Sequence, residues 1–69
     1  MVSVFKTNVY TEAKAESIIK MLKSKLSECE INFDLEDCDK ILRIEGVNIN
    51  EQKIIELLHI NKIQCEELI

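Results

Sequence analysis

The apolar residues of this chain change their spacing along the sequence, and that change constrains the fold more than any other feature. Residues 2–6 and 30–35 have the composition of short strands. In the second segment apolar and polar residues alternate strictly, as in a strand with one buried face. Between these segments the spacing becomes that of one helix face, at Ala15, Ile18, Ile19, Leu22 and Leu26. We expect a first helix over about residues 12–27, with Thr11 as its N-cap.

The second half of the chain repeats this change of spacing. The polar residues 36–39 have the length of a hairpin turn, and the alternation resumes over residues 40–45, so two antiparallel strands are expected here. The only glycine, Gly46, follows directly. Asn50 is a suitable N-cap for a second helix over about residues 50–60. Ile49 is expected to precede this helix and pack on Ile54. The buried face of the helix is expected to carry Ile54, Leu57 and Leu58, and Asn61 can end it.

A final alternating run at residues 62–66 predicts a last strand, which gives the order β-α-β-β-α-β in a single domain over residues 1–69. The fold class expected for this order is α+β, ferredoxin-like, with a four-stranded antiparallel sheet and two helices on one face. Strands one and three lie at its centre. The loop after strand one, the hairpin and the loop after helix two then share one end. The sequence leaves open whether Val2 and Val4 or Ser3 and Phe5 face the core.

Charge and cysteine content narrow the function classes. The net charge of -4 disfavours nucleic acid, and the segment 28–39 carries acidic charges only. Three cysteines do not form a disulfide framework, and no apolar run approaches the roughly 18 residues of a membrane span. We therefore expect a cytoplasmic protein with free thiols and no membrane partner.

Catalytic and cofactor motifs are missing from the sequence. It has one histidine, no Cys-x-x-Cys motif and no glycine-rich phosphate loop. The acidic residues from Asp34 to Asp39 lack the spacing and glycine of a calcium loop. We expect no enzymatic activity and no cofactor.

The alternating segments 31–36 and 41–46, followed by the helical segment 50–58 and a short final strand, resemble the heavy-metal-associated domains of copper chaperones and metal-pumping ATPases. The resemblance covers nearly the whole chain and implies the ferredoxin-like fold. Those domains hold a soft metal with a Met-x-Cys-x-x-Cys loop between the first strand and the first helix.

In this chain the corresponding loop has lost those ligands. The helix register places Val9 at the methionine of the family, and Thr11 and Lys14 at its two cysteines. Neither side chain replaces a thiolate. The resemblance therefore implies the scaffold without its metal site. One alternative remains, a metal-handling protein that uses Cys38 and His59, since both belong to the end of the fold at which the three loops are expected to meet.

The leading hypothesis is a non-catalytic interaction module whose partner is another protein or a second copy paired through an edge strand. The candidate contact residues are Val9, Tyr10, Thr11, Lys14, Asp37 and Cys38. For two of them a structural role is also open: Val9 as a core residue and Tyr10 as a flank packed on the first helix. A third hypothesis is a small-molecule sensor similar to ACT domains, but residues 7–11 lack the glycine that is typical of their ligand loop.

Overall fold

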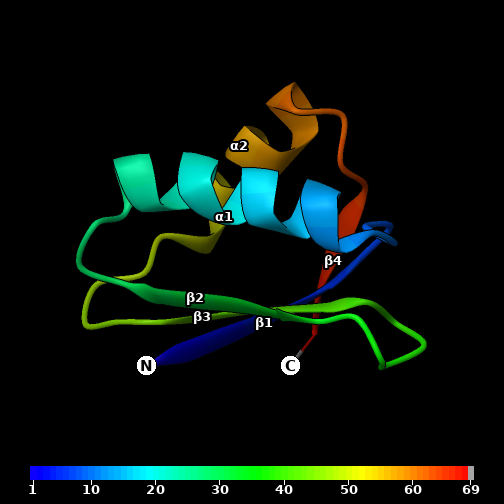
Figure 1. Ribbon diagram of the computed structural model, residues 1–69. Coiled ribbons are helices and arrows are strands. Elements are labelled where there is room, and N and C mark those ends of the chain that lie inside the picture. The colour runs from blue at the N-terminus through cyan, green and yellow to red at the C-terminus, as the bar shows by residue number, and fades with distance from the viewer. Residues whose placement is uncertain (69) are drawn as a thin grey trace.

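The computed structural model describes residues 1–68 and shows two layers, a sheet and a pair of helices (Figure 1). The elements are β1 (Val2–Thr7), α1 (Glu12–Lys25), β2 (Glu30–Asp34), β3 (Ile41–Glu45), α2 (Glu51–Ile60) and β4 (Cys65–Leu68). The sheet has the order β2-β3-β1-β4 with every neighbouring pair antiparallel, and both helices cover the same face (Figure 1). This arrangement confirms the predicted α+β, ferredoxin-like fold class with β1 and β3 at the centre.

The face of β1 that meets the helices carries Ser3 and Phe5. Phe5 is fully buried opposite Leu42 of β3, whereas Val2 on the open face is 54% exposed. Ser3 is also buried, and its hydroxyl donates a hydrogen bond to Oε2 of Glu51 at 3.1 Å, so this polar group is not left without a partner. The strand therefore turns Ser3 and Phe5 toward the core and places Val2 and Val4 on the opposite face.

Both predicted N-caps are confirmed. The side-chain oxygen of Thr11 accepts a hydrogen bond from the Lys14 amide at 3.2 Å, and that of Asn50 accepts one from the Lys53 amide at 3.1 Å. The first helix ends earlier than predicted, with Leu26 as its C-cap. The fully or nearly fully buried residues that the two helices contribute are Ala15, Ile18, Leu22, Ile54 and Leu58.

The sequence predicts the last strand over residues 62–66, but it lies at Cys65–Leu68. Residues 62 and 63 instead close the end of α2. Lys62 takes the left-handed conformation with φ 63°, and the Ile63 amide donates to the Leu58 carbonyl at 2.8 Å. Ile63 is buried because it packs on the core as the last contact of this helix end, and not as a strand residue.

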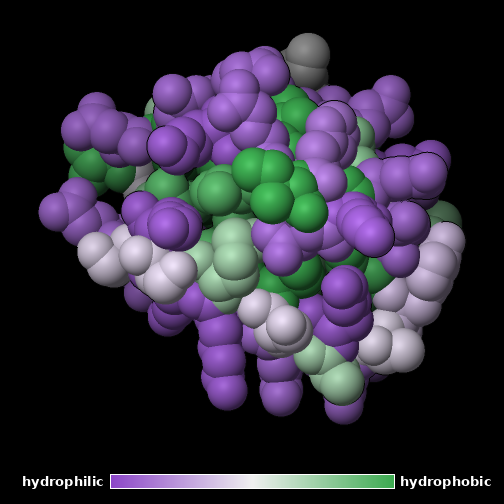
Figure 2. Space-filling view, turned by 90° about the horizontal axis from the view of Figure 1, so that it is seen from above, coloured by the Kyte–Doolittle hydropathy of each residue, from purple (hydrophilic) through white to green (hydrophobic). Residues whose placement is uncertain are grey.

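The helix side of the molecule is mainly hydrophilic, with apolar atoms gathered near the middle of the face (Figure 2). None of the helices within residues 1–68 combines the length and the apolar character needed to cross a membrane.

Candidate functional site

Hydrogen bonds join three segments at one end of the sheet, as predicted: the loop after β1, the β2–β3 hairpin and the loop after α2. The Thr7 amide donates to the Asp39 carbonyl at 3.1 Å. The Asn8 amide donates to the Gln64 carbonyl at 3.2 Å, and the Gln64 amide returns a bond to Oδ1 of Asn8 at 3.0 Å. We call this region the loop end.

The hydroxyl of Thr7 fixes the start of the loop that leads into α1. This side chain is 8% exposed, and its Oγ1 donates to the Lys40 carbonyl at 2.6 Å while accepting from the Val9 amide at 3.2 Å. One buried hydroxyl therefore ties the loop backbone to the hairpin. Contacts within the chain therefore fix the position of this loop.

Val9 and Tyr10 take opposite orientations in this loop. Val9 is 1% exposed and belongs to the hydrophobic core, so it has no surface to offer a partner and is removed from the candidate contacts. Tyr10 is 70% exposed, so its ring does not pack into the flank of the first helix. Of the two, only Tyr10 is available for binding.

Lys40 links Tyr10 to the hairpin, a role that sequence analysis missed. Its ammonium donates to the Leu35 carbonyl at 2.8 Å and lies 6.0 Å from the centroid of the Tyr10 ring, at the outer limit of a cation–π contact. Its backbone has φ 49°, which is uncommon for a residue with a long side chain. The sequence does not indicate this role, because a lysine that follows a polar turn is usually a solvated surface residue.

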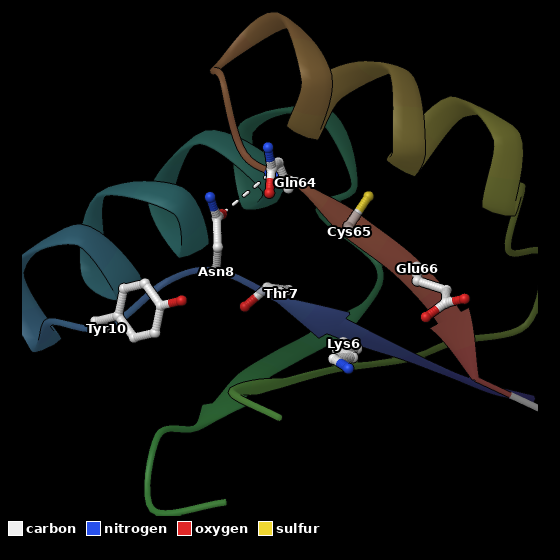
Figure 3. A pocket seen from close by; sticks show the side chains of 7 residues that line it. All are labelled: Lys6, Thr7, Asn8, Tyr10, Gln64, Cys65 and Glu66. Carbon is white, nitrogen blue, oxygen red and sulfur yellow. Dashed lines mark hydrogen bonds between the residues drawn. The ribbon is translucent and has the colours of Figure 1, made fainter. Parts of the chain in front are cut away.

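An open hollow of about 280 Å³ lies beside the Asn8–Gln64 hydrogen bond, where the end of β1 pairs with the start of β4 (Figure 3). Its lining residues are Lys6, Thr7, Asn8, Tyr10, Gln64, Cys65 and Glu66. Burial raises the pKa of the Cys65 thiol, so near neutral pH this sulfur stays protonated and is a poor nucleophile. The side chains that line the hollow can provide hydrogen bonds and the aromatic ring of Tyr10 to a ligand, but no reactive thiolate.

The hairpin brings potential metal ligands together, but not the predicted pair. Among residues 1–68, the side chains of Asp37, Cys38 and Asp39 form one group whose ligand atoms lie within 4.8 Å of one another, and His59 is not part of it. One carboxylate oxygen of Asp37 already accepts the Asp39 amide at 2.8 Å. The acidic residues here serve the turn backbone, and Cys38 and His59 are not assembled with them into one site.

Thr11 and Lys14, which the sequence resemblance aligns with the two cysteines of heavy-metal-associated domains, both lie on the surface. The Thr11 hydroxyl oxygen is engaged as the cap of α1. Thr11 therefore serves helix initiation, and the exposed side chain of Lys14 adds a cationic ammonium group in the first turn of α1.

The residues that organise the loop end were not predicted as site residues. Thr7, Asn8 and Gln64 act through hydrogen bonds to segments far away in the sequence. The sequence indicated their position only through the predicted order of the elements, which places the three loops at the same end of the sheet. A scan of the chain against protein-family models found no match, and neither did a search of curated proteins.

Proposed function

We propose that this chain is a non-catalytic interaction module that binds a partner protein at the loop end. The observation that supports the proposal most directly is Tyr10, a large aromatic side chain that is 70% exposed on a loop held by hydrogen bonds. Exposed tyrosines are enriched at protein interfaces, and a loop fixed in advance loses less conformational entropy on binding.

The proposed contact surface surrounds Tyr10. It comprises the exposed residues Thr11 and Lys14 at the start of α1, together with the half-buried Asp37 and the exposed Cys38 in the hairpin. Lys40 joins the two parts, because its ammonium lies near the Tyr10 ring and bonds to the hairpin backbone. The surface carries both signs of charge, which suits a protein partner better than nucleic acid.

We further propose that the scaffold is a relative of heavy-metal-associated domains that lacks their metal loop. The fold and the buried position of Val9, at the place of the family's methionine, support this kinship. A cytoplasmic setting is part of the proposal and is supported by the three free thiols, Cys29, Cys38 and Cys65.

Affinity capture from a native cell extract tests the function with three immobilised proteins: the unaltered chain, Tyr10→Ser and Val47→Ser. Val47 is the matched control, because it is 88% exposed and follows β3, at the opposite end of the sheet. We expect a protein that is enriched by the unaltered chain and by Val47→Ser and is lost with Tyr10→Ser. Circular dichroism would confirm that all three are folded.

Equal capture by all three proteins would contradict the loop end as the contact surface. Enrichment of no protein above the empty matrix would contradict the interaction function itself.

A further inference from the structure

An open groove of about 510 Å³ runs between α1 and the outer edge of the sheet. Along this edge α1 lies above β2 (Figure 1). Its apolar lining comes from Ala15 and Ile19 of α1 and from Phe33 and Leu35 on the β2 side. Ile19, Phe33 and Leu35 are only partly buried, so part of each side chain remains accessible from the groove. The groove can therefore accept an apolar side chain from outside.

The rim of the groove is acidic. Glu12 and Glu16 lie one helical turn apart on α1, and Glu36 lies across from them after β2. Within residues 1–68 these three carboxylates have no ion-pair partner, because the salt bridges there join Lys6 to Asp39 and Arg43 to Asp34. The rim therefore favours a cationic ligand.

One wall of the groove is a free strand edge. β2 pairs with β3 on one side, and no other strand of the described chain pairs with its outer side. Such an edge presents backbone donors and acceptors to a further strand. Side chains on one face of that strand would point under α1, into the groove, because strand side chains alternate between faces.

A second copy of the chain does not suit this edge. Full-length antiparallel pairing of two β2 strands centres on Asn32 and places Glu30 against Asp34 twice across the two-fold axis. The β4 edge has the same difficulty, because equivalent pairing of Cys65–Leu68 places Glu66 against Glu67. Like charges at both edges argue against the homodimer through edge strands that the sequence left open.

We propose that the groove between α1 and β2 binds an extended, lysine- or arginine-containing segment of a partner protein, which adds to the β2 edge as a fifth strand. Its backbone pairs with β2, one apolar side chain lies between Ile19 and Phe33, and its cationic side chains meet Glu12, Glu16 and Glu36. This groove borders the surface around Tyr10, because Glu12 and Glu36 are chain neighbours of Thr11 and Asp37, but neither Tyr10 nor Lys14 lines it. Substitutions at Glu16 and at Tyr10 therefore test the two surfaces separately.

The probe is a synthetic peptide of alternating lysine and valine with blocked ends, titrated into the full-length isotope-labelled chain and followed by NMR. We expect saturable shifts confined to β2 and the first half of α1, together with slower hydrogen exchange at β2 amides that are unpaired in the free protein. A peptide of alternating glutamate and valine should cause neither effect.

Two charge reversals locate the binding. Glu16→Lys alters the groove, and the matched control Glu56→Lys makes the same charge change at an exposed position of α2. We expect Glu16→Lys to weaken peptide binding about fivefold, the size of one exposed ion pair, and Glu56→Lys to leave it within about twofold.

Equal weakening by both variants would overturn the proposal, because it would indicate attraction to net charge alone. Shifts centred on β4 or on Tyr10, or the absence of saturable binding, would also overturn it. So would self-association through the groove, seen as a dimer in sedimentation that Glu16→Lys dissolves. None of these outcomes decides whether Tyr10 binds a partner, because the capture experiment tests that surface separately.

Discussion

The sulfur of Cys29 occupies the space in which a β-carbon on Gly46 would lie, since a Cβ built there falls 2.8 Å from Sγ. The two residues face each other just beyond the last pair of β2 and β3, which joins Glu30 to Glu45. The backbone of Gly46 does not need a positive φ. The chain therefore requires glycine at this position for close packing and not for conformational freedom.

Gly46→Ala should lower the free energy of unfolding by about 1–2 kcal/mol, because the added methyl forces the Cys29 side chain to move within a partly packed site. Urea denaturation measures the change. In a Cys29→Ala background the same substitution should cost less, since the sulfur is gone. Strictly additive effects of the two substitutions would contradict this contact.

Lys62 adopts the left-handed conformation that closes α2, with φ 63°, and this conformation strains any residue that carries a β-carbon. Lys62→Gly should therefore raise the free energy of unfolding by about 0.5–1 kcal/mol. The matched control is Lys20→Gly in the middle of α1, which removes the same charge from an exposed position and should lower stability by about 1 kcal/mol. Changes of the same sign in both variants would contradict the assignment.

The fold could be predicted because the residues that determine each helix and the hairpin lie close to one another in the sequence. Spacing of apolar residues defines both helices and the β2–β3 hairpin, and the caps Thr11 and Asn50 need only the amides three residues ahead. The placement of β4 could not be predicted in the same way. Ile63 and Cys65 alternate as strand residues would, and Lys62 gives no glycine signal for a helix end.

The loop end could be predicted only in outline. Whether Tyr10 packs inward depends on the direction of the loop, and that direction follows from bonds between Thr7 and Lys40 and between Asn8 and Gln64. These partners are separated by 33 and 56 residues in the sequence. Local spacing carries no information about contacts of that range.

Thr7→Val should destabilise the protein by about 1–3 kcal/mol, although it preserves the shape of the side chain. The substitution leaves the Val9 amide and the Lys40 carbonyl without the hydroxyl that satisfies both. Thr7→Ser keeps the hydroxyl and should cost less. Hydrogen exchange of the Val9 amide should accelerate in Thr7→Val alone, and an unchanged rate would show that this bond does not hold the loop.

The thiol of Cys65 predicts a loss of stability at alkaline pH. Burial raises its pKa in the folded state, so between the unfolded and folded pKa values the unfolded chain binds fewer protons and is favoured as the pH rises. The free energy of unfolding should therefore decline above the ordinary thiol pKa of about 8.5. Cys65→Ala should remove part of this decline, whereas Cys38→Ala, which alters an exposed thiol, should not. Denaturant titrations across this range provide the measurement, and an identical alkaline decline in both variants would assign it to other groups.

The same burial predicts that iodoacetamide alkylates Cys38 before Cys65 near neutral pH. The thiolate is the reacting species, burial raises the pKa of Cys65, and Cys65 is half-buried whereas Cys38 is exposed.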